Sequence, residues 1–179
     1  MKQNIFATVC VLLAFVLQST AVKWISFGGI CPNLLIVIIA ALGFTYGCNM
    51  GLLSGFFAGL LWDLFYGDLL GFYALVFMYV GYMNGGFWQI FFKEDIKLPV
   101  ILVTGSDVIF GVTSYVMRFL LRGRFDFANY FGHVILPEAV YTALITLLIF
   151  PLFAKITTRL DRPVQKGKGP VIEIRETEV

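Results

Sequence analysis

Residues 43–67 read GFTYGCNMGLLSGFFAGLLWDLFYG, and small residues recur in them at intervals of four: Gly43, Gly47, Gly51, Gly55 and Gly59, then Asp63 in the next position and Gly67 after it. In a water-soluble helix each interior glycine costs about 1 kcal/mol relative to alanine. In a bilayer, small residues one turn apart let two helix backbones approach closely, and van der Waals contact then drives association. The pattern therefore predicts a helix-packing seam inside a membrane.

Composition supports the same environment. Hydrophobic residues make up 59% of the 179 residues and charged residues only 13%, which predicts an integral membrane protein. Ten of the 24 charged residues lie after residue 154. We expect a polytopic membrane domain over 1–154 and a disordered, cytoplasmic charged tail over 155–179, whose basic residues contact lipid headgroups. The tail holds six basic and four acidic residues, so we expect no nucleic-acid partner.

Apolar stretches predict a compact all-α bundle of six transmembrane helices, at Ile5–Val22, Asn33–Tyr46, Met50–Phe65, Leu69–Phe87, Leu98–Leu121 and His133–Phe153. The second helix begins after Cys31-Pro32 with Asn33 as its cap, and Gly47 separates it from the third. These two helices measure about 21 and 24 Å, short of a hydrocarbon core of about 30 Å. They are therefore thin spans or a re-entrant hairpin; one unbroken helix from Asn33 to Phe65 is the alternative.

The charges between the spans predict the orientation. With both ends inside, nine lysines and arginines lie on the inner side and four on the outer side, so we expect both termini to be cytoplasmic. The outward arginines are Arg118, Arg122 and Arg124, and we expect Arg118 to extend toward the headgroups. A cleaved signal peptide ending near Ser19-Thr20-Ala21 is the alternative interpretation of the first span.

Asp63 is one of the few ionisable residues within the spans, and two interpretations of its role are open. A charge at the centre of a membrane helix costs about 2.5 to 3.5 kcal/mol and is seldom kept without a partner. In the first reading, the Asp63 carboxyl accepts backbone hydrogen bonds from the turn at Gly67–Gly71. In the second, it is aimed at a neighbouring helix or a partner protein, together with the packing or partner face made by Gly51, Gly55 and Gly59.

Asp107 and Glu138 are expected to be buried in adjacent helices, with Tyr141 nearby. Two such carboxylates could share a proton, yet a neutral, hydrogen-bonded Glu138 beside Pro137 is the simpler state. The chain has one histidine, His133, and its three cysteines, Cys10, Cys31 and Cys48, lack metal or disulfide spacing. No catalytic set, metal site or cofactor is therefore predicted.

Two blocks of sequence resemble a known family. Pro32-Asn33-Leu34-Leu35, residues 51–67 and Leu70-Gly71-Phe72-Tyr73-Ala74-Leu75 are similar to the central signature of the bacterial rod shape-determining protein MreD family. The second block, Leu136-Pro137-Glu138 with Tyr141 and 150–153, is similar to the last helix of that family. Many members carry asparagine after this tyrosine, whereas this chain has Thr142.

The resemblance implies a non-enzymatic subunit of the cell-elongation machinery in the bacterial cytoplasmic (inner) membrane. Its expected partner is the bitopic protein MreC, which connects the family to MreB filaments, the RodA glycosyltransferase and a class B penicillin-binding transpeptidase that together build side-wall peptidoglycan. The family body is also held to resemble the substrate-binding components of vitamin uptake transporters.

Two other functions stay open at this stage. The first is a membrane transport subunit that binds a vitamin-like ligand through Asp107, Glu138 and Tyr141. The second is a lipid-processing enzyme, which the absence of a nucleophile set disfavours.

Overall fold

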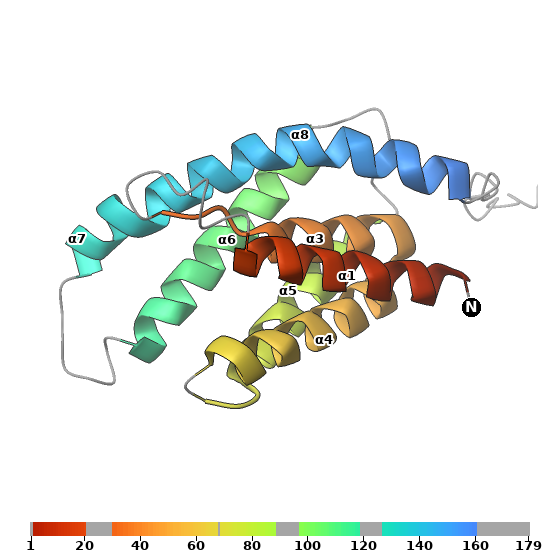
Figure 1. Cartoon of the computed structure of the whole chain (residues 1–179). Helices are drawn as coiled ribbons and strands as arrows, with labels where there is room; N and C mark the ends of the chain where they lie inside the picture. The colour runs from red at the N-terminus through yellow and green to blue at the C-terminus, as the bar shows by residue number, and fades with distance from the viewer. Residues whose placement is uncertain (1, 21–29, 68, 89–96, 119–126, 161–179) are drawn as a thin grey trace, which may run out of the picture.

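The computed structural model describes residues 2–20, 30–67, 69–88, 97–118 and 127–160, and the regular elements in these ranges are helices (Figure 1). They are α1 (Lys2–Thr20), α3 (Leu34–Tyr46), α4 (Cys48–Tyr66), α5 (Phe72–Gly86), α6 (Lys97–Arg118) and one continuous segment made of α7 (Phe127–Tyr130), the π-helical turn η2 (Phe131–Ile135) and α8 (Leu136–Leu160). The predicted all-helical class is confirmed. The predictions for Arg122, Arg124 and residues 161–179 lie outside the described residues.

The centre of the bundle is α3. It contacts α1, α4, α5, α6 and α8, and its residues from Leu35 to Phe44 are almost all buried. Its 13 residues are apolar on every side, as expected of a helix enclosed by others. The predicted cap is confirmed, because the Asn33 side chain accepts a hydrogen bond from the Ile36 backbone N–H at 3.3 Å.

Four helical segments are long and apolar enough to cross a membrane: Gln3–Thr20, Cys48–Tyr66, Lys97–Met117 and Phe127–Thr157. The two remaining helices, α3 with 13 residues and α5 with 15, are shorter. At 1.5 Å per residue they extend about 20 and 22 Å, less than a hydrocarbon core of about 30 Å. The six expected helices are thus present, and four of them have the length of a full span. The prediction that the third helix is too short to span is wrong, because α4 has 19 residues, whereas the fourth helix, α5, is shorter than predicted.

Backbone conformation corrects three predictions. The alternative of one unbroken helix from Asn33 to Phe65 is wrong, because Gly47 has φ 89° and ψ −178° and interrupts it. The fourth helix begins at Phe72 instead of Leu69, since Gly71 has a left-handed φ of 95° that ends the preceding turn. The sixth extends over Phe127–Leu160 and so exceeds the predicted His133–Phe153 at both ends.

A π-helical turn joins the two parts of the last helix, and Pro137 accounts for its position. Proline has no N–H to donate to the carbonyl four residues earlier, and its ring clashes with that carbonyl in a regular α-helix. Here the Leu136 N–H donates to the Phe131 carbonyl, five residues back, which widens the helix just before the proline.

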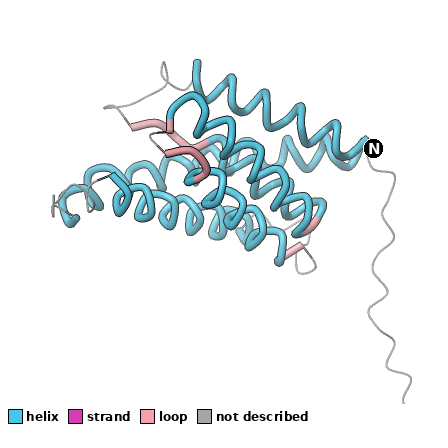
Figure 2. Tube along the Cα trace, turned by 90° about the horizontal axis from the view of Figure 1, so that it is seen from below, coloured by secondary structure: helices cyan, strands magenta, loops and turns pink. Residues whose placement is uncertain are grey.

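The described chain starts and finishes at the same end of the bundle, because the first turn of α1 and the last turn of α8 lie together there (Figure 1). The view from below shows the helices stacked side by side, with the described loops at the two ends of the bundle (Figure 2). An even number of membrane crossings places both ends of a chain on the same side in this way.

Candidate functional site

The residues Gly51, Gly55 and Gly59 of α4 lie directly against the backbone of α5, and we call this contact the glycine seam. A Cβ atom added at Gly55 would lie 2.1 Å from the Phe77 carbonyl oxygen, and one at Gly51 would lie 2.2 Å from the Gly81 carbonyl oxygen. Real Cβ contacts essentially never fall below 3.0 Å. The predicted glycine face therefore packs against a helix of the same chain, where no larger residue fits.

The other side of the seam also consists of glycine. A Cβ atom at Gly81 would lie 2.0 Å from the Gly51 carbonyl oxygen, and one at Gly85 would lie 2.5 Å from the Cys48 Cα atom. From α3, Gly43 approaches both, with a Cβ distance of 3.0 Å to the Gly81 oxygen. Gly81 and Gly85 were missed in the sequence, although they repeat the four-residue spacing.

Asp63 closes the seam at the start of α5. Its carboxyl oxygens accept backbone hydrogen bonds from Gly71 at 3.0 Å, Tyr73 at 3.0 Å and Ala74 at 2.9 Å. Only 3% of the residue is exposed. An acceptor at a helix N-terminus satisfies donors that have no partner within the helix and stabilises the positive end of the helix dipole. The Asp63 side chain thus fastens α4 to α5 and is covered by them.

A second set of polar side chains meets at the start of α3, and we call Gln18, Asn33, Asp107 and Thr142 the α3 polar cluster. The Gln18 Oε1 atom accepts a hydrogen bond from the Leu34 N–H at 2.8 Å, and its Nε2 donates to the Pro32 carbonyl at 3.1 Å. The Asn33 N–H donates to the Thr142 hydroxyl at 3.1 Å. The cluster joins residues of α1, α3, α6 and α8.

Asp107 is the member of the α3 polar cluster whose hydrogen bonding is incomplete. It is 3% exposed and faces Thr142 and Asn33, but neither carboxyl oxygen has a partner at hydrogen-bonding geometry among the described residues. Such buried polar atoms are few in folded proteins, and each costs stability. Glu138 and Tyr141 lie on α8 shortly before Thr142, and both are half-buried.

Thr142 is the position at which this sequence departs from the family pattern. In the structure it is fully buried, and its hydroxyl accepts the Asn33 N–H at the centre of the bundle. Gln18 carried no sequence signal beyond being a polar residue within an apolar span. The role of both residues is to satisfy backbone groups at a helix start that is buried away from water.

One further side-chain bond links α5 to α6. The Asn84 Nδ2 atom donates to the Ser106 hydroxyl at 2.8 Å and to the Val80 carbonyl at 2.8 Å. Nearby, the rings of Phe77 and Phe110 stack with centroids 5.1 Å apart. Asn84 is thus a buried contact between helices that sequence reasoning did not single out.

The described residues offer few side chains suited to catalysis or metal binding. They contain no group of three or more His, Cys, Asp or Glu side chains that could hold a metal ion. Cys10, Cys31 and Cys48 are half-buried, and no disulfide joins them to one another within the described residues. The buried polar residues Asp63, Asn84 and Thr142 instead form hydrogen bonds that join one helix to another or to its cap.

Comparison with known proteins identifies the family. The sequence model described as rod shape-determining protein MreD matches residues 2–159 of the 179. No curated protein and no solved structure matches the chain. The matched range contains the glycine seam, Asp63 and the α3 polar cluster. The chain therefore belongs to the MreD family of rod shape-determining membrane proteins.

Proposed function

We propose that this protein is a non-enzymatic subunit of the bacterial elongation complex that binds an MreC-like bitopic protein in the inner membrane. Through that partner it helps to couple MreB filaments to side-wall peptidoglycan synthesis by RodA and a class B penicillin-binding transpeptidase. Both termini are cytoplasmic in this proposal. The family match over residues 2–159 is the observation that carries it.

The geometry supports a scaffold in two ways. Because α5 and α3 already cover the glycine face of α4, a partner helix binds the outer surface of the bundle instead. That surface exposes large apolar side chains, such as Leu64, Leu148 and Ile101, which suit lipid or a transmembrane helix. The glycine seam and the Asp63 bonds hold this surface in a fixed shape.

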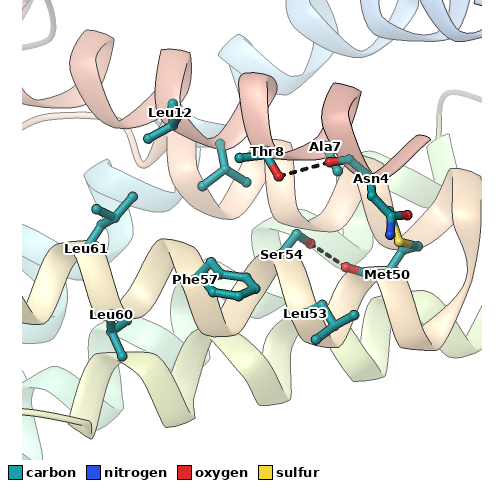
Figure 3. A pocket seen from close by; sticks show the side chains of 11 residues that line it. Asn4, Ala7, Thr8, Leu12, Met50, Leu53, Ser54, Phe57, Leu60 and Leu61 are labelled. Atoms are coloured by element: carbon teal, nitrogen blue, oxygen red, sulfur yellow. Dashed lines mark hydrogen bonds between the residues drawn. The ribbon is translucent and has the colours of Figure 1, made fainter. Parts of the chain in front are cut away.

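The transport alternative gains no specific support. A transport subunit is expected to bind its ligand at Asp107, Glu138 and Tyr141. The structure has a cavity between α1 and α4 (Figure 3), and none of these three residues lines it.

Shape rescue tests the proposal. In a rod-shaped bacterium depleted of its own MreD-family protein, the wild-type chain and the control Gly105→Leu should restore rods, whereas Gly55→Leu should leave round cells. Gly105 is an exposed helix glycine with no atom within 4 Å of an added Cβ, so it matches Gly55 in residue type but not in packing. Failure of the wild-type chain to restore rods, at normal abundance, would contradict the proposal.

A further inference from the structure

One outward side of α5 carries two tyrosines. Leu75, Tyr79, Tyr82 and Met83 are between 43% and 61% exposed. Residues three and four positions apart lie on the same side of a helix, so these four form one stripe, which we call the tyrosine face. The other sides of α5 contact α3, α4 and α6. The tyrosine face is therefore the side of α5 that the described part of the chain leaves open.

Tyr79 lies near the middle of the membrane. A Cβ atom at Gly59 of α4 would meet Ala74, and one at Gly85 would meet Cys48, so α5 runs beside α4 from one end to the other. The helix α4 is long enough to cross the bilayer. Tyr79 is seven residues from either end of α5, which is about 10 Å at 1.5 Å per residue. Its hydroxyl is thus in the hydrocarbon core and not in the interfacial belt where tyrosine is usual.

Tyr82 lies one turn further along α5, four residues before the end of the helix at Gly86. Side chains of an α-helix tilt toward its N-terminus, so the Tyr82 ring leans away from the nearer end of α5 and toward the level of Tyr79. The tyrosine face therefore presents two phenol hydroxyls inside the hydrocarbon core.

Neither of these hydroxyls has a hydrogen-bond partner among the described residues. The outward threonines differ, because Thr8, Thr104 and Thr113 each donate to a carbonyl four residues back in their own helix, at 2.9, 2.7 and 2.7 Å. A phenol hydroxyl is too far from its own backbone to do the same. The hydrocarbon core holds no water and acyl chains carry no acceptor, so an unpaired hydroxyl there costs free energy. Another protein helix can supply the missing acceptors, whereas lipid cannot.

We propose that the tyrosine face binds a single membrane-spanning helix that carries two hydrogen-bond acceptors one turn apart. This inference rests on the proposed function, in which that helix belongs to the MreC-like bitopic protein. Tyr79 and Tyr82 are three residues apart, which matches serine, threonine, asparagine or glutamine side chains three or four residues apart on a helix packed alongside. Gly86 continues the face, and no atom lies within 4 Å of a Cβ added there, so the partner backbone can approach closely.

A second copy of the chain fits the tyrosine face less well. Two copies in one bilayer are related by a two-fold axis along the membrane normal, so each tyrosine would face its own counterpart. Two phenols share one hydrogen bond, which leaves one of their two O–H donors unpaired. A helix with hydroxyl or amide side chains accepts from both Tyr79 and Tyr82.

Binding of the full chain to the full-length MreC-like protein of the same bacterium tests the proposal. Both proteins are labelled and placed in phosphatidylethanolamine–phosphatidylglycerol vesicles, and energy transfer between the labels gives the dissociation constant. The double variant Tyr79→Phe/Tyr82→Phe removes the two hydroxyls and keeps the rings. Each hydroxyl should account for about threefold in affinity, so the double variant should bind about eightfold more weakly. Tyr66→Phe, at an exposed tyrosine at the end of α4, should bind as the wild type does.

A larger side chain on the tyrosine face tests the packing. Leu75→Trp should weaken binding about tenfold or more, because it holds the partner helix away from α5. Leu148→Trp is the matched control, since Leu148 is exposed on α8 and should leave binding unchanged. Both leucines are on the outer surface, so both variants should unfold in sodium dodecyl sulfate as the wild type does.

Three results would overturn the proposal. If the wild type binds, and Leu75→Trp and the double variant bind equally well, the partner helix lies elsewhere and the proposed function stands. If the wild type does not bind the MreC-like protein, the proposed function fails and this interface fails with it. If the variants lose self-association of the chain in the same vesicles but keep partner binding, the face belongs to a second copy.

Discussion

Adding a single methyl group at Gly55 should separate two helices. The added Cβ atom would lie 2.1 Å from the Phe77 carbonyl oxygen, where ordinary contacts begin above 3.0 Å, so α4 and α5 must move apart by about 1 Å. Both atoms belong to the backbone or are fixed to it, and no side chain can rotate away to relieve the contact.

The size of the effect follows from two opposing terms. Overpacking costs about 1 to 3 kcal/mol or more, and a gap of 0.5 to 1 Å forfeits roughly a quarter to a half of each contact's attraction along the seam. The better helix propensity of alanine returns about 1 kcal/mol. We therefore expect Gly55→Ala to lower the free energy of unfolding by about 2 kcal/mol.

Gly105→Ala is the matched control, because Gly105 lies inside α6, is exposed and has no atom within 4 Å of an added Cβ. It should raise the free energy of unfolding by about 0.5 to 1 kcal/mol. Reversible unfolding by sodium dodecyl sulfate in mixed micelles measures both variants against wild type. Equal effects of the two substitutions would refute the close approach of α4 and α5.

Substitutions at three further positions test other contacts, in the same unfolding assay or by labelling. Asp63→Ala removes the acceptor of three backbone N–H groups and should cost about 3 kcal/mol, and Asp63→Asn about half of that; no loss in either would contradict the cap at α5. The Asp107 carboxyl oxygens have no hydrogen-bond partner among the described residues, so Asp107→Asn, which keeps the shape of the side chain, should cost nothing; a loss above about 1 kcal/mol would reveal a partner for that carboxyl. Pro137→Ala restores the missing N–H, so the π-helical turn should become α-helical and rotate the segment before it by about 100°. Thiol labelling of single cysteines placed at 127–135 should report that rotation, and an unchanged pattern would show that Pro137 does not cause the turn.

The four-residue spacing of Gly51, Gly55 and Gly59 was enough to predict a packing seam, because in a membrane such spacing serves close helix contact. Asn33 was predictable as a cap for a similar local reason, since cap preference depends on the next few residues alone. Gly47 was recognisable as a break between two helices. In each case the information lies within one or two helical turns.

The partner of the seam could not be identified in the same way. Which helix faces Gly55 depends on how the whole bundle folds, and Gly81 and Gly85 gain meaning only when α5 lies against α4. The α3 polar cluster also brings together residues that are distant in the sequence. Asn33 and Thr142 are more than 100 positions apart, and Gln18 comes from a third helix. Spacing along one chain does not encode such contacts.

Helix ends were predicted less well than helix centres. The start of α5 depends on Asp63, eight to eleven residues earlier, whose carboxyl holds Gly71, Tyr73 and Ala74. The last helix continues past both ends of the predicted His133–Phe153, because hydropathy marks where the chain leaves the hydrocarbon and not where helical hydrogen bonding ends. Pro137 and Pro151 lie within it without ending it.

Purification of the tagged protein from its own membranes in mild detergent tests the proposed function most directly. The account predicts that an MreC-like bitopic protein and wall-synthesis proteins are recovered with the wild-type chain, in stable amount and without a stoichiometric vitamin-like ligand. Recovery of such a ligand with an ATPase module, in place of the MreC-like protein, would contradict it.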